Sequence, residues 1–311
     1  MVEDNQIKAQ ISPFAIREGE IKTFDGKDGY VSMNQIVHKI NIGHINEIHF
    51  AILELVNEFE FITSRQLYQM LEIKGIDPKS QDKLNNKLEQ LVKSKILTRY
   101  YFNSDEGKGI YRIYCLEKMG KYLLNSKEVE CKWQPSDNTK PVPMIKKRLA
   151  GNQTLIAYLR KVKAFDSYIV KPAITAKVTG KVFKASGGSV KLTKNKKSIQ
   201  FLFEVIRREQ EWEKKLVEKM RLYKDFYENF VAGDSGFSTM PQLILICEDE
   251  KHMALAFKEI VKNQVEIPQI KLYFTTDLRQ NKETLEDTLV EFKLVDGKYK
   301  MEDIELKLLG M

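Results

Sequence analysis

The chain has 311 residues, of which 42% are hydrophobic, with a formal net charge of +8 and a pI of about 9.0. This length exceeds one small domain and indicates two. No run of 18 apolar residues occurs, so we expect no membrane partner, and residues 1–10 lack the layout of an export signal. Three cysteines, far apart in sequence, favour a reducing compartment, and we expect the protein in the cytoplasm without a zinc site.

The first part of the chain alternates turn signals with apolar patterns. Residues 21–40 surround an Asp25-Gly26 pair with aromatic and β-branched side chains, which is typical of a β-hairpin. Residues 46–58 repeat apolar side chains three and four positions apart, and this spacing predicts an amphipathic helix. Thr63 followed by Gln66 forms a capping box at the start of the next helix, which Gly75 ends.

A second helix is predicted from Asp77-Pro78, because Asp is a preferred N-cap and Pro is tolerated at the first helical position. Two strands follow, at residues 96–102 and 109–114, with a Gly-rich turn between them. Helix, turn, helix and hairpin together predict a winged helix-turn-helix, an α+β domain that we place at residues 1–126.

The polar face of the second helix is a candidate DNA-binding surface. A helix fits the major groove, where amide groups can read base edges and ammonium groups can contact phosphates. The predicted base readers are Gln81, Asn85 and Asn86. The predicted phosphate contacts are Lys79, Lys83, Lys87, Arg99 and Lys108. The acidic turn at Asp105 and Glu106 disfavours phosphate, so use of this domain for protein docking remains an alternative.

The basic excess lies in one central segment. Residues 127–200 carry 17 Lys and Arg against 4 Asp and Glu, whereas residues 1–126 carry 17 of each. Such a block is typical of a phosphate-binding surface, although a solvated Lys-rich face is the alternative. The predicted contacts of this segment are Lys146, Lys147, Arg148, Lys194, Lys196 and Lys197.

Residues 127–143 are rich in proline and polar side chains without periodicity, and we interpret them as a linker. A second domain is predicted at residues 144–311. It begins with a helix over 144–162, and strands and helices alternate from about residue 198 to residue 275. This alternation predicts an α/β domain with parallel strand pairs in a mixed central sheet. An Asp296-Gly297 turn predicts a closing hairpin.

Residues 201–226, FLFEVIRREQEWEKKLVEKMRLYKDF, join a strand that carries Glu204 and Arg207 to a helix that carries Lys219 and Tyr223. Together with a later strand that ends in Thr275-Thr276-Asp277, this layout resembles the C-terminal half of the replication-relaxation family. Members of that family pair an N-terminal winged helix with a domain similar to the PD-(D/E)XK nuclease core. The resemblance implies a link to plasmids and other mobile elements of Gram-positive bacteria.

The chain departs from the nuclease pattern at positions that matter for catalysis. Such an enzyme holds Mg²⁺ with two or more carboxylates and positions water with a Lys. Here Ile206 occupies the position of the catalytic Lys, and residues 188–191 lack the upstream Asp. Glu204 and Lys219 remain candidates, but we assign no catalytic residue and no metal site. Whether the protein is an enzyme stays open, but the sequence favours a protein without catalytic activity. We expect no cofactor, except Mg²⁺ if the protein is a nuclease.

The sequence therefore favours a DNA-binding accessory or regulatory protein of a plasmid or mobile element, without catalysis. Its role would be replication, conjugative transfer or transcription control. One alternative is a metal-dependent DNA nuclease with a rearranged site, and another is a protein-docking module of a replication or transfer complex. The expected partners are double-stranded DNA and replication or relaxase-type proteins, and a homodimer is left open.

Overall fold

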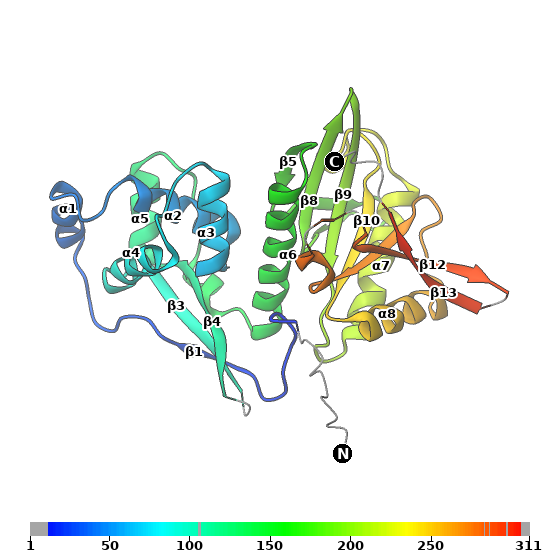
Figure 1. The fold of residues 1–311 in the computed structure, drawn as a ribbon, viewed down its shortest axis with the longest axis horizontal. Coiled ribbons are helices and arrows are strands. Elements are labelled where there is room, and N and C mark those ends of the chain that lie inside the picture. Colours follow the sequence, from blue (N-terminus) through cyan, green and yellow to red (C-terminus); the bar gives the residue numbers. More distant parts are fainter. Residues whose placement is uncertain (1–11, 105–106, 283, 286, 297, 306–311) are drawn as a thin grey trace, which may run out of the picture.

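The computed structural model describes residues 12–104, 107–282, 284–285, 287–296 and 298–305 of the chain. These residues form an α+β protein with two lobes, which lie side by side in Figure 1. We call residues 21–126 the N-terminal lobe and residues 142–304 the C-terminal lobe. In the described part of the chain, no helix combines the length and apolar character needed to cross a bilayer.

The N-terminal lobe packs helices against an antiparallel sheet with strand order β1-β3-β4-β2. Its helices are α1 (Met33–Asn41), α2 (Glu47–Phe59), α3 (Ser64–Ile73), α4 (Gln81–Lys93) and α5 (Lys118–Ser126). Its strands are β1 (Ile21–Phe24), β2 (Ile62–Thr63), β3 (Leu97–Ser104) and β4 (Gly107–Leu116). The predicted sequence of helix, turn, helix and two strands is therefore present.

The hairpin predicted around Asp25-Gly26 is wrong. Strand β1 pairs with β3 instead, and Arg99 closes this pairing by donating from Nε to the carbonyl oxygen of Asp25 at 2.9 Å. The Phe24 and Tyr100 rings pack edge to face across the two strands, 5.9 Å apart. The second half of the predicted hairpin is helix α1, which begins after a capping box between Ser32 and Gln35.

The capping box predicted for α3 is confirmed. The Gln66 amide donates to Thr63 Oγ1 at 3.2 Å, and the Thr63 amide donates to Gln66 Oε1 at 3.1 Å. The predicted end is confirmed as well, because Gly75 follows the helix with a φ of +72° that few other residues tolerate.

The predicted N-cap of α4 is wrong. Asp77 accepts the amide of Lys79 at 2.7 Å in a local turn, and Lys79 takes a φ of +69°. The cap is Ser80, whose Oγ accepts the amide of Lys83 at 3.2 Å, so the helix begins at Gln81. A short Asp side chain competes for a nearby amide in just this way, and the helix start moves to the next capping residue.

Residues 127–143, predicted as a linker, lie against the N-terminal lobe. They contain a 3-10 turn at Pro135–Thr139, and helix α6 (Val142–Lys161) begins before their end. Trp133 donates from Nε1 to Asn138 Oδ1 at 3.1 Å, and Asn138 donates from Nδ2 to the Leu116 carbonyl at 2.8 Å. These bonds hold the segment to the end of β4.

The C-terminal lobe is built on a mixed sheet with strand order β13-β12-β11-β10-β9-β8-β5. Its strands are β5 (Phe165–Ile169), β8 (Gly188–Lys194), β9 (Lys197–Val205), β10 (Gln242–Cys247), β11 (Leu272–Thr276), β12 (Leu289–Val295) and β13 (Lys298–Ile304). A separate two-stranded sheet holds β6 (Ala173–Ala176) and β7 (Lys181–Lys184). The predicted parallel pairs are confirmed, because β10 runs parallel to both β9 and β11.

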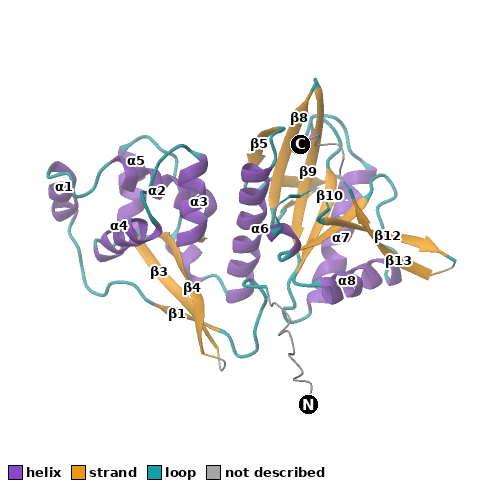
Figure 2. Ribbon diagram, viewed as in Figure 1, coloured by secondary structure: helices purple, strands orange, loops and turns teal. Residues whose placement is uncertain are grey.

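Helices cover both faces of this sheet (Figure 2). Phe201 and Phe203 of β9 belong to the core that includes α6. Leu202, between them, belongs to the core of helices α7 (Trp212–Glu228) and α8 (Glu250–Lys262). Alternating side chains point to opposite faces of a strand, so α6 lies on one face and the other two helices on the other.

The two lobes meet where α3 packs against α6, and they share one hydrophobic core. Gln66 Nε2 donates to the carbonyl oxygen of Leu149 at 2.8 Å, and Asn152 Nδ2 donates to that of Phe61 at 2.7 Å. Both polar side chains are almost completely buried. Because buried hydrogen bonds fix geometry, these contacts set the position of one lobe against the other.

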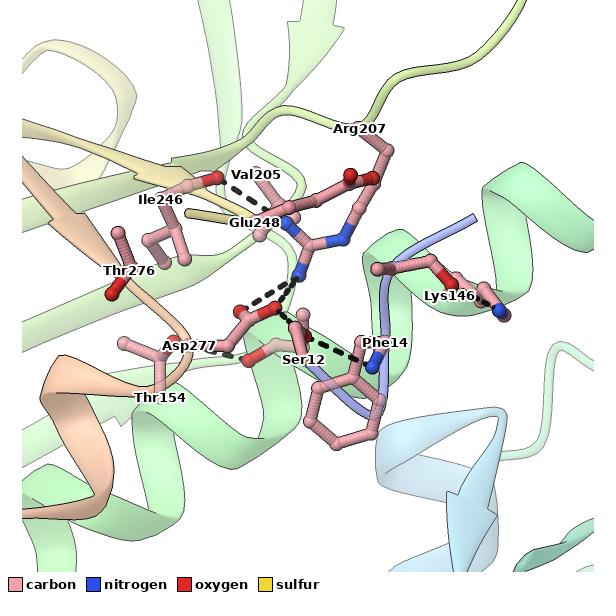
Figure 3. A network of polar contacts seen from close by, with 12 residues as sticks. Ser12, Phe14, Lys146, Thr154, Val205, Arg207, Ile246, Glu248, Thr276 and Asp277 are labelled. Atoms are coloured by element: carbon pink, nitrogen blue, oxygen red, sulfur yellow. Dashed lines mark hydrogen bonds and ion pairs between the residues drawn. The ribbon is translucent and has the colours of Figure 1, made fainter. Parts of the chain in front are cut away.

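A segment that precedes β1, residues 12–20, crosses both lobes, and we call it the N-terminal strap. Ser12 donates from its hydroxyl to Asp277 in the C-terminal lobe. Tyr111 of β4 donates from its hydroxyl to the Pro13 carbonyl at 2.9 Å. Lys146 of α6 donates to the Ala15 carbonyl. Figure 3 shows Ser12 and Phe14 beside Asp277, where the strap passes the ends of the parallel strands.

Candidate nucleic-acid interface

The three amide side chains predicted as base readers lie together on α4. Gln81, Asn85 and Asn86 all line a cleft of about 1330 Å³ between the lobes. Gln81 donates from Nε2 to Asn85 Oδ1 at 3.2 Å, so a ligand that displaced this bond would meet two amides side by side. The opposite side of the helix is buried, as the apolar stripe predicted, through Leu84, Leu88, Leu91 and Val92.

The three lysines predicted beside them lie on the adjacent side of α4. Lys79, Lys83 and Lys87 line a smaller hollow of about 290 Å³, which also includes Asn86. Lys79 pairs with Asp77 at 2.9 Å, and both side chains are largely exposed. An exposed pair of this kind contributes about 0–1 kcal/mol, so it leaves Lys79 available to another anion. The structure therefore separates amides from ammonium groups, with Asn86 on the border.

The other two predicted contacts of this lobe differ in their surroundings. Arg99 is largely enclosed and pairs with Glu89 at 2.5 Å and with Asp25 at 2.9 Å. Its guanidinium group lines the cleft, but these two carboxylates already engage it. The side chain of Lys108 lies outside the described residues. A cation that the sequence did not single out, Arg112, also lines the cleft and pairs with Asp25 at 2.8 Å.

The predicted basic face at the start of α6 is wrong for Lys146. Its side chain is only 1% exposed and pairs with Glu20 of the strap at 2.5 Å. Burial lowers the pKa of Lys146, and the Glu20 carboxylate opposes this shift. The sequence places Lys146 one turn from apolar Leu149, but only the folded strap brings Glu20 over it. Lys146 therefore joins the N-terminal strap to helix α6.

The two neighbouring cations of α6 are also engaged. Lys147 pairs with Glu209. Arg148 donates from Nη1 to the carbonyl oxygen of Val170 at 2.9 Å, and burial lowers the pKa of Arg148 to about 10. Neither lines the cleft. These residues support a structural role at the base of α6 rather than a free phosphate-binding face.

The remaining predicted cations lie at the tip of the β8–β9 hairpin. Lys194, Lys196 and Lys197 are exposed, and the tight turn between the strands places Asn195 and Lys196 at positive φ. Lys194 lies opposite Lys197 in the backbone register of the hairpin. These lysines do not line the cleft, so the structure does not bring them together with the polar face of α4.

The cleft itself is lined mainly by amide and charged side chains from both lobes. Its amide side chains are Gln69, Gln81, Asn85, Asn86, Gln153, Gln280 and Asn281. Its cations are Arg65, Arg99, Arg112, Arg160 and Lys161. Its carboxylates are Glu72 and Glu89. The cationic side chains of such a surface can bind a polyanion, and its amide side chains can form hydrogen bonds with polar groups of the same ligand.

Several of these cleft residues were missed at the sequence level. Arg65 and Gln69 are four positions apart on α3, and their polar spacing was a usable signal for one exposed helix face. Gln280 lies in a short 3-10 turn, Arg279–Asn281, that follows β11. No local pattern marks such a residue, because only the packing of this turn against α6 brings it to the cleft.

Glu204, the candidate catalytic carboxylate, is surrounded by hydrogen-bond donors. It accepts from the Ser186 hydroxyl at 2.8 Å, the Ser186 amide at 3.2 Å and the Tyr223 hydroxyl at 2.7 Å. Lys219 Nζ lies 3.7 Å from it. Burial and the nearby Glu204 charge raise the pKa of Tyr223, so its hydroxyl stays a donor. The carboxylate is thus held by neutral donors and one cation.

This arrangement does not fit the Mg²⁺ site that a nuclease requires. A nuclease of this pattern holds Mg²⁺ with two or more carboxylates, whereas Glu204 is surrounded by two hydroxyl groups, one backbone amide and one ammonium group. Among the described residues, no three His, Cys, Asp or Glu side chains gather at one point. Through these hydrogen bonds, Glu204 joins β9 to α7 and to the turn before β8.

A second polar network lies at the carboxyl ends of the parallel strands (Figure 3). Arg207 follows β9 and donates from Nη2 to both carboxylate oxygens of Asp277, at 2.8 and 2.9 Å. Both side chains are buried. Burial raises the pKa of Asp277, and the Arg207 charge and the Ser12 hydroxyl oppose that shift. The resemblance drew attention to Arg207 and Asp277 separately, but only the structure pairs them.

Fold and interface together define a two-lobed α+β protein with a cleft lined by amides and cations. The chain belongs to the replication-relaxation family, whose model matches residues 53–239. Membership suggests a role in plasmid replication or mobilisation. The match spans α3, α4 and α6, which form most of the cleft, and ends before Gln280. No curated protein and no solved structure matches the chain.

Proposed function

We propose that this protein is a DNA-binding accessory or regulatory protein of a plasmid or related mobile element, and that it catalyses no reaction. Replication, conjugative transfer and transcription control are the processes it would serve. The observation that carries the proposal is the division of α4 into two adjacent sides. Amides Gln81, Asn85 and Asn86 form one side, and Lys83 and Lys87 belong to the other.

This division suits a helix that lies beside DNA. An α-helix with its side chains is about 10–12 Å wide and the major groove about 12 Å, so phosphates flank a helix that enters the groove. The ammonium groups would then face one phosphate backbone, and Asn86, which borders both sides of the helix, would face bases. On this proposal the N-terminal lobe is a winged helix-turn-helix domain at residues 1–126, and residues 144–311 form a domain similar to the PD-(D/E)XK core.

Support for a nuclease is weaker, because Glu204 lies among hydroxyl and amide donors rather than beside a second carboxylate. The proposal therefore needs no cofactor. Replication or relaxase-type proteins would be its protein partners, and they would act at the same DNA. Double-stranded DNA is the ligand that we propose for α4, because its lysines can contact the phosphates of a duplex.

The proposal is tested by the salt dependence of duplex binding, followed by fluorescence anisotropy with a labelled duplex of about 20 base pairs. Each phosphate contact releases counterions and contributes about 0.9 to the slope of log affinity against log salt. The Lys83→Ala, Lys87→Ala double variant should therefore lower the slope by about 2. A Lys251→Ala, Lys258→Ala variant removes the same charge from exposed positions on α8 and serves as the control.

Two results would count against the proposal. Absence of duplex binding at about 50 mM salt would remove it and favour the protein-docking alternative. Equal slopes for the α4 variant and the α8 control would show that binding does not use α4. The same assay applies to the Lys194→Ala, Lys196→Ala, Lys197→Ala variant, which tests the hairpin tip as an additional phosphate contact.

A further inference from the structure

The amide side of α4 faces the cleft between the two lobes. Gln81 and Asn85 line the cleft from one side, while Gln153 and Arg160 of α6 line it from the other. A duplex that approached these amides would have to enter between the two lobes. At about 1330 Å³ the cleft also exceeds the range of about 300–1,000 Å³ that is usual for small-molecule sites. Its size suits one strand of a polymer.

The cleft holds more cations than carboxylates. Arg65 is exposed near the first turn of α3. Arg160 is 45% exposed and lies 3.7 Å from Glu72, a separation at which an exposed pair contributes little. These guanidinium groups come from different lobes, and a phosphate backbone that followed the cleft would contact both.

A buried donor lies at the C-terminal-lobe side of the cleft. Gln280 is only 4% exposed, and its Nε2 has no hydrogen-bond acceptor among the described residues. A buried amide donor without an acceptor is unusual, since such groups are almost always paired. Lys161 approaches the same turn and donates to the Gln280 carbonyl at 2.7 Å. Burial and the nearby Arg160 charge lower the pKa of Lys161, as expected where cations gather.

An aromatic ring completes the site. Tyr68 lines the cleft, is partly buried, and lies three positions after Arg65 on α3, so both side chains share one helix face. Single-stranded nucleic acids are held by such a combination, because unpaired bases stack on aromatic rings while a cationic groove follows the backbone. Unpaired bases also offer the edges that amide side chains bind.

We propose that the cleft binds one unpaired strand of DNA. Arg65 and Arg160 contact its phosphates, while Gln81, Asn85 and Gln280 bind base edges. The inference rests on the proposed function for the identity of the ligand as DNA. From Gln153 to Lys161 the α6 wall rises about 12 Å, which leaves room for only a few nucleotides of the strand.

The test compares binding of a labelled single-stranded oligonucleotide of about 12 nucleotides with binding of the duplex of the same sequence. The full chain is used, as wild type and as the Arg65→Ala, Arg160→Ala variant. An Arg221→Ala, Lys214→Ala variant removes the same charge from exposed positions on α7, on the far face of the sheet, and is the matched control. We expect the cleft variant to bind the single strand about tenfold more weakly than the control does.

Each outcome separates this inference from the proposed function. Duplex binding without single-strand binding overturns the inference and leaves the function standing, whereas binding of neither form removes the function itself. A single-strand affinity that falls equally in the cleft variant and the α7 control also overturns the inference.

The buried donor is tested by Gln280→Met, which keeps the volume but removes Nε2. We expect single-strand affinity to fall about threefold with no loss of melting temperature, because no internal bond of that nitrogen is broken. A lower melting temperature with unchanged single-strand affinity would assign Gln280 to the structure alone, and would overturn its place in the site.

Discussion

The buried pair of Arg207 and Asp277 offers the sharpest test of how the C-terminal lobe is stabilised. Arg207 donates to both oxygens of Asp277 and, from Nη1, to the carbonyl of Ile206 at 2.8 Å. Arg207→Met keeps much of the volume and removes all of these bonds. Asp277 would keep the Ser12 hydroxyl as its side-chain donor. Breaking a buried pair by removing one partner costs about 3–5 kcal/mol, and we expect a loss of unfolding free energy in that range.

The measurement is urea unfolding followed by circular dichroism, with Arg221→Met as the control for loss of an exposed arginine. We expect the control to change stability by about 0.5 kcal/mol or less. Adding Asp277→Asn to Arg207→Met removes the uncompensated charge, so the double variant should regain about 1–3 kcal/mol over Arg207→Met. A loss below about 1 kcal/mol in Arg207→Met, or a further loss in the double variant, would refute the structural role assigned to this pair.

Two further predictions concern buried positions of the same lobe. Burial, reinforced by the Arg208 and Arg207 charges, lowers the pKa of His252 to about 3 from its ordinary 6.5. Below about pH 6.5 the unfolded chain therefore takes the proton first, and about 2 kcal/mol of stability is lost between about pH 7 and about pH 5. Urea midpoints should show that His252→Gln lacks this part of the pH dependence, and an identical dependence in both proteins would contradict the assignment. Gly151 lies in α6, where an added Cβ would stand 2.7 Å from the Gly187 Cα. Thermal unfolding of Gly151→Ala should show a loss of about 1–3 kcal/mol despite the better helix propensity of Ala, and a gain in stability would show that the two backbones can move apart.

Some elements of this fold could be predicted because their signals are local. The capping box of Thr63 and Gln66 uses atoms within one helical turn, and it is present in the structure. The apolar run at Gln242–Cys247 forms β10 with those bounds, since a strand buried on both faces needs no polar alternation. The parallel pairing of β9, β10 and β11 followed from the alternation of strands and helices.

Other predictions failed where contacts with residues far away in the chain overrode a local sequence pattern. Asp25-Gly26 is typical of a hairpin turn, but β1 pairs with β3, and Phe24 packs on Tyr100 across the two strands. Lys146 was expected at the surface, because a sequence shows the charge of a residue but not the carboxylate that will cover it. The covering residue, Glu20, lies in a strap that no periodicity marks.

By itself, the sequence determined the run of helix, turn, helix and two strands from α3 to β4, the polar face of α4 and the resemblance that the family match confirms. These features depend on the spacing of residues along the chain, which can be read without knowledge of the fold. The tertiary structure decided that the amides of α4 face α6 across a cleft, that Gln280 reaches that cleft, and that Arg207 pairs with Asp277. Each of these joins residues far apart in the chain, and only the packing of the two lobes on a shared core brings them together.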